Sequence, residues 1–132
     1  MPRFVILRHD SPRGEHFDFM LEAGDSLKTW ALPHSPEAGV EIDCEALADH
    51  RLAYLEYEGP ISGERGAVTR WDRGTFSLER QSSEEWAVTL AGERVAGQAT
   101  LLRSADDPKK WRFSLARQDR SQSGGSTASA AP

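Results

Sequence analysis

The chain has 132 residues, of which 38% are hydrophobic and 28% are charged, and this composition is typical of one globular domain large enough to bury a core. Its formal net charge of −5 argues against extensive, sequence-independent binding to nucleic acid. A small site that recognises one strand end is compatible with this charge. The only cysteine, Cys44, excludes an internal disulfide and a cysteine-based zinc cage.

The first residues lack the long apolar region of a signal peptide, and no apolar run approaches the ~20 residues that a membrane span needs. We therefore expect a cytoplasmic, monomeric protein without membrane contact. Cys44 lies in an acidic stretch with no adjacent base, so we interpret it as a structural residue rather than a nucleophile.

A short apolar strand opens the chain, from Phe4 to Leu7, and it carries His9 and Asp10 at its end. Residues 11–14 have the composition of a turn, which folds the chain back. The next stretch alternates strictly between apolar and polar residues, which is the signature of a half-buried strand. Its apolar side is Phe17, Phe19 and Leu21, and its polar side is His16, Asp18, Met20 and Glu22. We expect the first side to face a core and the second to point outward.

The following residues predict further short strands separated by turns. A turn over 23–25 leads to a partner strand over 27–32, which Pro33 and Pro36 end. The later elements are a short helix or turn over 43–50, a strand over 52–58, a hairpin of strands 67–71 and 75–80 about a turn at 72–74, and strands over 85–90, 94–102 and 111–115. This series predicts a mainly β fold, either an antiparallel barrel or a sandwich.

Residues 118–132 consist largely of Ser, Gly, Ala and Thr without an apolar pattern. Such a composition cannot offset the entropy of ordering the chain, so it predicts a disordered, dispensable tail. The folded domain is accordingly expected to occupy residues 1–117.

Histidines and carboxylates concentrate where the predicted turn brings His9 and Asp10 back toward His16 and Asp18. Imidazole nitrogen combined with carboxylate oxygen suits Mn, Fe or Zn. Three protein ligands would leave coordination positions open, as a catalytic metal requires. A structural histidine bonded to a neighbouring acid is the alternative for His16 and Asp18 taken alone.

Four other residues are weaker candidates when each is taken singly. His50 could be a solvated histidine, and His34, which lies between two prolines, is interpreted as a loop histidine. Arg13 and Arg65 lie in predicted loops that could face the histidine cluster. Because a guanidinium suits bidentate contact with phosphate, both arginines are candidate phosphate-binding residues.

A series of motifs extends along the chain in a fixed order. They are Arg8-His9-Asp10, His16-Phe17-Asp18-Phe19-Met20-Leu21-Glu22, Lys28-Thr29-Trp30-Ala31-Leu32-Pro33, Asp49-His50-Arg51-Leu52-Ala53-Tyr54, Tyr57-Glu58-Gly59-Pro60-Ile61, Gly63-Glu64-Arg65-Gly66, Trp71-Asp72-Arg73-Gly74-Thr75, Gly97, Leu101-Leu102-Arg103 and Trp111. Together they resemble the 3′-phosphoesterase domain of bacterial DNA ligase D, over nearly everything except the tail.

This resemblance implies a small closed antiparallel β-barrel with one or two short helices. It also implies DNA end repair, in which a 3′-phosphate or a 3′-terminal ribonucleotide is removed with a divalent metal, typically manganese. The implied metal ligands are His9, His16 and Asp18, while His50 contacts the scissile phosphate and Tyr54 lies in the same active site. The implied partners are a nucleic-acid 3′ end and, for repair, a DNA ligase or polymerase.

The sequence departs from the family pattern at several positions. The gap between His9 and His16 is one residue longer, so the turn is expected to bulge. Leu7 replaces a polar residue, His34 replaces a lysine, and Met20 replaces a phosphate-binding arginine. Because Met20 lies on the polar side of its predicted strand, the wild type is expected to be a weak phosphoesterase, and Met20→Arg is expected to raise phosphate release.

Three functions stay open at this point. The first is a metal-dependent phosphoesterase acting on nucleic-acid 3′ ends, with His50, Arg13 and Arg65 as phosphate contacts. The second is a weak or inactive relative that binds a metal, a DNA end or a repair partner, which Met20 supports. The third is a non-haem iron oxygenase, because two histidines and one carboxylate also form that triad. The resemblance favours the first, since it extends far beyond the triad.

Overall fold

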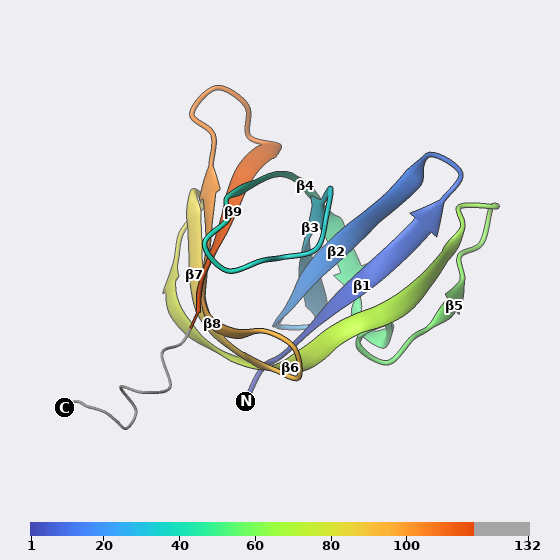
Figure 1. Cartoon of the computed structure of the whole chain (residues 1–132), viewed down its shortest axis with the longest axis horizontal. Helices are drawn as coiled ribbons and strands as arrows, with labels where there is room; N and C mark the ends of the chain where they lie inside the picture. Colours follow the sequence, from blue (N-terminus) through green and yellow to red (C-terminus); the bar gives the residue numbers. More distant parts are fainter. Residues whose placement is uncertain (118–132) are drawn as a thin grey trace.

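The computed structural model of the chain describes residues 1–117, so the tail expected over 118–132 lies outside the described residues. These residues form a mainly β structure, as predicted (Figure 1). Its strands are β1 (Arg3–Ser11), β2 (Gly14–Ala23), β3 (Ser26–Leu32), β4 (Ile42–Arg51), β5 (Gly59–Pro60), β6 (Ala67–Gln81), β7 (Glu85–Gly92), β8 (Ala96–Arg103) and β9 (Lys110–Arg117). The helical content of this part of the chain is a single 3₁₀ turn, η1 (Leu52–Leu55), and no helix in it is long and apolar enough to cross a membrane.

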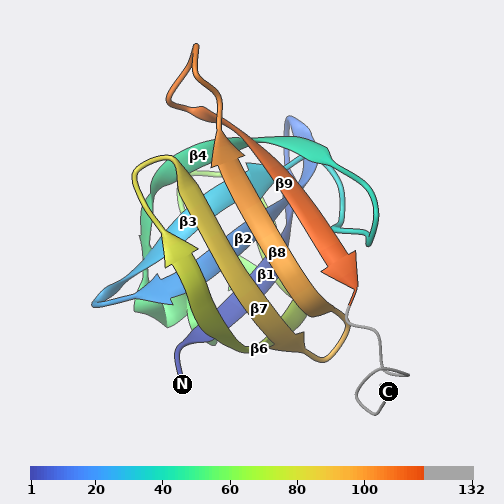
Figure 2. The ribbon, with the colours of Figure 1, turned by 90° about the vertical axis from the view of Figure 1, so that its left-hand side faces the viewer.

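The strands pair in the order β1-β2-β3-β4-β9-β8-β7-β6-β5, and β1 also pairs with β6. All of these pairs are antiparallel, and eight strands therefore form a closed ring. β6 closes this ring because its first half pairs with β1 and its second half with β7. Figure 2 shows β6 to β9 as one layer in front of β1 to β3, whose strands cross it.

The main core lies between these two layers and is rich in aromatic side chains. Phe17, Phe19 and Leu21 face it, as the alternation predicted. Trp30 lies at its centre, edge-on to Trp86 and Trp111 at centroid distances of 5.9 and 5.5 Å. Such rings each bury a large apolar area and prefer these tilted contacts, so they supply much of the driving force for folding.

Cys44 is also buried in this core, on β4. Burial, followed by the charge of Asp43, raises the pKa of the Cys44 thiol to about 12. The thiol is therefore protonated in the neutral pH range, which agrees with a structural rather than a nucleophilic cysteine.

A second apolar cluster covers the opposite face of β1 to β3. Its buried members are Val5, Leu7, Met20, Leu27, Leu55 and Val68, with Leu52, Tyr54 and Ile61 packed against them. Because η1 and the residues after it lie on this face, β2 is buried on both sides. The expectation that the polar side of β2 points outward is therefore wrong for Asp18 and Met20, which are 4% and 1% exposed.

Two predictions fail in the segment between β3 and β5. The helix expected over 43–50 is wrong, because residues 42–51 form β4 between β3 and β9. Ile42 and Cys44 alternate into the core there, and this pairing outweighs the helix preference of the residues that follow. The strand expected over 52–58 is also wrong, because residues 52–55 turn as η1 and bury Leu55 on the second cluster.

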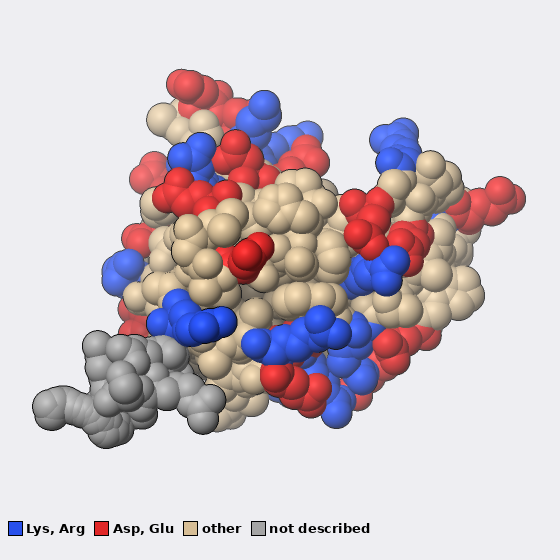
Figure 3. All heavy atoms as spheres, viewed as in Figure 1, with Lys and Arg blue, Asp and Glu red and all other residues tan. Residues whose placement is uncertain are grey.

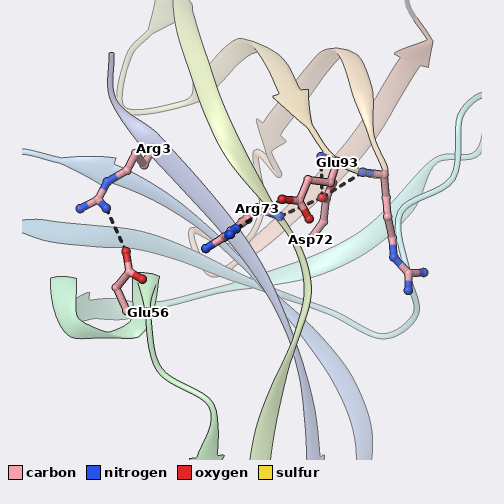
Figure 4. Close-up of polar contacts among 6 residues, drawn as sticks. Arg3, Glu56, Asp72, Arg73 and Glu93 are labelled. Atoms are coloured by element: carbon pink, nitrogen blue, oxygen red, sulfur yellow. Dashed lines mark hydrogen bonds and ion pairs between the residues drawn. The ribbon is translucent and has the colours of Figure 1, made fainter.

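The hairpin predicted at 72–74 is wrong as well, since these residues belong to the uninterrupted strand β6. Asp72 is buried, and its carboxylate accepts hydrogen bonds of 2.8–2.9 Å from the backbone N–H groups of Arg73, Glu93, Arg94 and Val95. Figure 4 shows Asp72 together with Arg73 and Glu93. Asp72 therefore holds the turn between β7 and β8 instead of making a turn of its own. The turns predicted over 11–14 and 23–25 are confirmed.

Candidate metal centre

His9 and His16 face each other across the β1–β2 hairpin. The ladder pairs every residue from Phe4 opposite Leu21 to Ser11 opposite Gly14, so His9 lies directly opposite His16. Their ring centroids are 4.6 Å apart. The predicted bulge is wrong, because this ladder has no register shift and only residues 12 and 13 form the turn.

Asp18 joins the two histidines because residues two apart on a strand share a face. One carboxylate oxygen, Oδ1, lies 3.0 Å from Nε2 of His16, and the other, Oδ2, lies 3.6 Å from Nδ1 of His9. One ligand atom from each residue falls within 4.8 Å of the others. The sequence prediction that these three side chains converge is thus confirmed, although their binding of a metal stays a prediction.

The ring of His9 is oriented from its other side by the segment that precedes β6. Its Nε2 donates a hydrogen bond of 2.7 Å to the backbone carbonyl of Arg65, which leaves the lone pair of Nδ1 facing Asp18. Metal-binding histidines are characteristically held by such a carbonyl. Gly66 permits the arrangement, because its φ is +93° and a Cβ there would overlap the carbonyl oxygen of Asp10.

The carboxylate of Asp18 has the properties of a cation ligand. It is buried, and beyond the contact with His16 its Oδ1 has no hydrogen-bond partner among residues 1–117. A buried carboxylate is costly unless its charge is paired, so a divalent cation fits the space between this oxygen and the imidazole nitrogens. Without a metal, the close contact with Asp18 raises the pKa of His16, its negative charge adds to the effect, and burial of the ring opposes it.

His50 and Tyr54 form a separate group. Nδ1 of His50 donates a hydrogen bond of 2.9 Å to the carbonyl of Ala48, and the ring lies edge-on to Tyr54 at a centroid distance of 5.6 Å. The ladder places His50 opposite Leu27, on the face that carries the triad. The cluster of possible metal ligands among the described histidine, cysteine and acidic side chains is nevertheless the triad alone, and His50 is not part of it.

The structure gives different positions to the remaining candidates. Arg13 is exposed in the turn between β1 and β2. The guanidinium of Arg65 donates to the carbonyl and the hydroxyl of Ser62, at 2.8 and 3.3 Å, so this residue touches the triad through its backbone rather than its side chain. His34 is exposed in the loop after β3, where a loop histidine was predicted. The role of the Arg65 carbonyl was missed because a backbone contact leaves no residue-type signal.

Comparison with known proteins decides the family. The family model described as "DNA Ligase D 3′-phosphoesterase domain" matches residues 7–103, a span that contains the triad, His50 and Tyr54. The chain belongs to this family.

Two relatives of this chain show how much of its sequence matches a ligase D protein and how much of each ligase D protein it covers. The chain is 37% identical over 113 residues to the multifunctional non-homologous end joining DNA repair protein LigD of Mycobacterium tuberculosis, covering 79% of this chain and 15% of that protein. It is 35% identical over 112 residues to the multifunctional non-homologous end joining protein LigD of Pseudomonas aeruginosa, covering 77% of this chain and 13% of that protein. The chain thus spans a small part of the length of both relatives.

An open groove of about 1080 Å³ leads away from the triad in this member of the phosphoesterase family. It begins at His16, passes the ends of β3 and β4, and reaches the loop between β8 and β9. Lys109 and Lys110 line it together with Glu45 and Asp107, so its charge is mixed. Of the three triad residues, His16 lines this groove.

Proposed function

We propose that this chain is a divalent-metal-dependent phosphoesterase that removes a 3′-phosphate or a 3′-terminal ribonucleotide from nucleic-acid ends during DNA repair. The observation that carries the proposal is the convergence of His9, His16 and Asp18, with ligand atoms within 4.8 Å, in a member of the ligase D 3′-phosphoesterase family. The relatives are named for non-homologous end joining, and the repair role and its partners are inferred for this chain from that kinship.

The triad would hold the metal, which we propose to be Mn²⁺. Nδ1 of His9, Nε2 of His16 and the carboxylate of Asp18 are the proposed ligands, and three ligands leave positions open for substrate. When bound, such an ion polarises a phosphoryl oxygen. The carbonyl of Arg65 fixes the tautomer of His9, so that Nδ1 carries the lone pair that a ligand needs.

Three residues are proposed to contact the substrate, and a fourth, Tyr54, is proposed to orient one of them. His50 keeps Nε2 available because Nδ1 donates to Ala48, so it could stabilise charge on the scissile phosphate or protonate the leaving oxygen. Tyr54, which lies edge-on to His50, would orient the imidazole ring of His50. The ladders place His50 in the row of Leu27 and Glu22, and Glu22 lies four residues along β2 from Asp18, so the substrate would have to extend over this distance. Arg13 could swing from its turn toward the phosphate, whereas Arg65 would first have to leave Ser62.

The distribution of charge on the surface supports a small local binding site rather than an extended nucleic-acid-binding surface. On the face shown in Figure 3, acidic and basic side chains are interspersed around a central area of other residues. We propose that the groove beside His16 guides the strand, and that the ring of eight strands is the small closed barrel implied by the resemblance. We also propose a monomer in the cytoplasm that works beside a DNA ligase or polymerase.

The test is Mn²⁺-dependent phosphate release from a 3′-phosphorylated primer. His16→Ala and Asp18→Ala should each lose Mn²⁺ affinity in calorimetry and lower the rate by a hundred-fold or more, because a ligand is removed. His34→Ala is the matched control, since this histidine is exposed in a loop, and it should keep both properties.

The competing function is a binding relative without turnover. The observation that favours it is Met20, an apolar residue buried where the family pattern has a phosphate-binding arginine. Wild-type protein that binds Mn²⁺ but releases no phosphate would establish this alternative and refute the enzyme. Oxygen uptake with Fe²⁺ and an oxoacid would instead support an iron oxygenase.

A further inference from the structure

We propose that Arg70, on β6, binds the phosphoryl group that the triad presents. The inference rests on the proposed function, but it concerns a residue that the family resemblance and the sequence patterns do not single out. It places the phosphate-binding cation on a strand different from the one that carries Met20.

The sheet register puts Arg70 on the face of the triad. Leu7 pairs with Asp18 on one side and with Arg70 on the other, so these three side chains form one row across three strands. His9 lies opposite Val68, which makes Arg70 its diagonal neighbour. Diagonal neighbours lie about 7–8 Å apart, a distance that a long side chain can span.

A β-bulge is what gives Arg70 this orientation. Ile6 pairs with Asp72, but the next residue, Leu7, pairs with Arg70, so the register shifts and Trp71 has no partner on β1. In an unshifted ladder, Trp71 would lie opposite Leu7. Bulges often re-aim a side chain beside an active site, and this one turns the arginine toward the histidines.

Among the described residues, Arg70 forms no ion pair. Its side chain is half-buried, and its Nε is buried without a hydrogen-bond partner among residues 1–117. None of the ion pairs formed within these residues includes Arg70, whereas Arg73 and Arg80 of the same strand pair with glutamates. The nearby carboxylate of Glu58 accepts a 2.7 Å hydrogen bond from the backbone N–H of Arg70 rather than from its guanidinium.

These properties match those of an anion-binding residue. An unpaired buried donor costs free energy, which a bound phosphoryl oxygen would recover. Buried Leu7 and Val68 flank Arg70 on the sheet, and the low local dielectric strengthens a charge-assisted contact. The planar guanidinium can also donate hydrogen bonds to two phosphoryl oxygens at once. An anion bound between the guanidinium and a divalent cation would offset the repulsion between these two positive charges.

The experiment compares the wild-type chain of 132 residues with Arg70→Gln, Arg70→Lys and the control Arg80→Gln, which changes an exposed arginine of the same strand. Sulfate, as a phosphate mimic, is titrated calorimetrically into each Mn²⁺-loaded protein, and kcat and KM for 3′-phosphate release are measured separately. Arg70→Gln should weaken sulfate binding and lower kcat/KM by about ten- to a hundred-fold, the equivalent of one charge-assisted contact. Arg70→Lys should recover part of this loss, and Arg80→Gln should behave as wild type.

Mn²⁺ affinity in the absence of sulfate separates anion binding from a merely structural role. Removing a nearby positive charge should leave this affinity unchanged or raise it, whereas disruption of the fold would lower it together with the thermal midpoint. Equal sulfate affinity in wild type and Arg70→Gln, or no sulfate binding by wild type, would overturn the proposal even if the enzyme is active. Arg70-dependent sulfate binding without phosphate release would uphold it and refute the enzymatic function alone.

Discussion

At the scale of single residues, the metal centre depends on contacts that local sequence only partly reveals. Strict alternation and a turn were enough to predict that His16 and Asp18 share a face with His9. The burial of the neighbouring Met20 could not be predicted, because residues that pack on this face of β2 come from η1 and the segment after it, more than thirty positions away. The carbonyl of Arg65 was equally inaccessible to prediction, since any residue type offers a carbonyl.

The burial of Met20, which the sequence did not predict, can be tested by substitution of this residue. Its side chain is 1% exposed and belongs to the second cluster, so the face that it shares with His16 and Asp18, from which the expected gain of Met20→Arg was argued, is apolar and covered around Met20. Met20→Arg would place a charge among apolar side chains and should reduce the free energy of unfolding by about 3 kcal/mol or more. Urea denaturation of wild type, Met20→Arg and the control Met20→Leu measures this directly.

The control should lose less than about 1.5 kcal/mol, because leucine has a similar volume and keeps the cluster apolar. A Met20→Arg protein as stable as wild type, with faster phosphate release, would show instead that the new side chain leaves the cluster and reaches the phosphate.

At the scale of elements, strands were predicted correctly where apolar and polar residues alternate along the chain. They were predicted wrongly where pairing with strands distant in the sequence determines the structure. The β1–β2 and β2–β3 hairpins were predicted because their turns and alternation are local signals. β4 was not, because it contains helix-forming residues and becomes a strand only between two neighbours. β6 was divided into a hairpin because Asp-Arg-Gly is typical of turns, whereas here the aspartate serves a different turn.

The contacts of Asp72 predict a large stability effect from a single carboxylate. Asp72→Ala would leave several backbone N–H groups of β6 and the β7–β8 turn without an acceptor, and should cost about 3 kcal/mol or more. The measurement is again urea denaturation, with Asp106→Ala as the control because Asp106 is an exposed loop carboxylate. The control should stay within about 0.5 kcal/mol of wild type. Equal losses in both variants would show that Asp72 does not hold the turn.

At the scale of the whole molecule, the metal centre joins two distant parts of the chain. The triad lies on the β1–β2 hairpin, but its orientation depends on the segment before β6, and both lie at the same end of the ring (Figure 1). A ligand that binds only the folded state stabilises all of it by mass action. Metal binding should therefore raise the stability of the whole described domain rather than of one hairpin.

Thermal unfolding with and without Mn²⁺ tests this linkage. Mn²⁺ at a hundred times its Kd should add about 2.7 kcal/mol to the free energy of unfolding, and a chelator should reverse the gain. His16→Ala should abolish the shift, while His34→Ala should retain it. A shift of equal size in the His16→Ala protein would mean that Mn²⁺ stabilises the fold from somewhere other than the triad.

The closure of the ring by β6 also bears on how the protein behaves in a crowded solution. Unpaired strand edges act as templates on which other chains can add, and this addition is a common route to aggregation. Here the strand order ends at β5, which has two residues and includes Pro60. Since so short an edge with a proline offers little backbone for a foreign strand, this end of the strand order is protected against sheet-to-sheet growth.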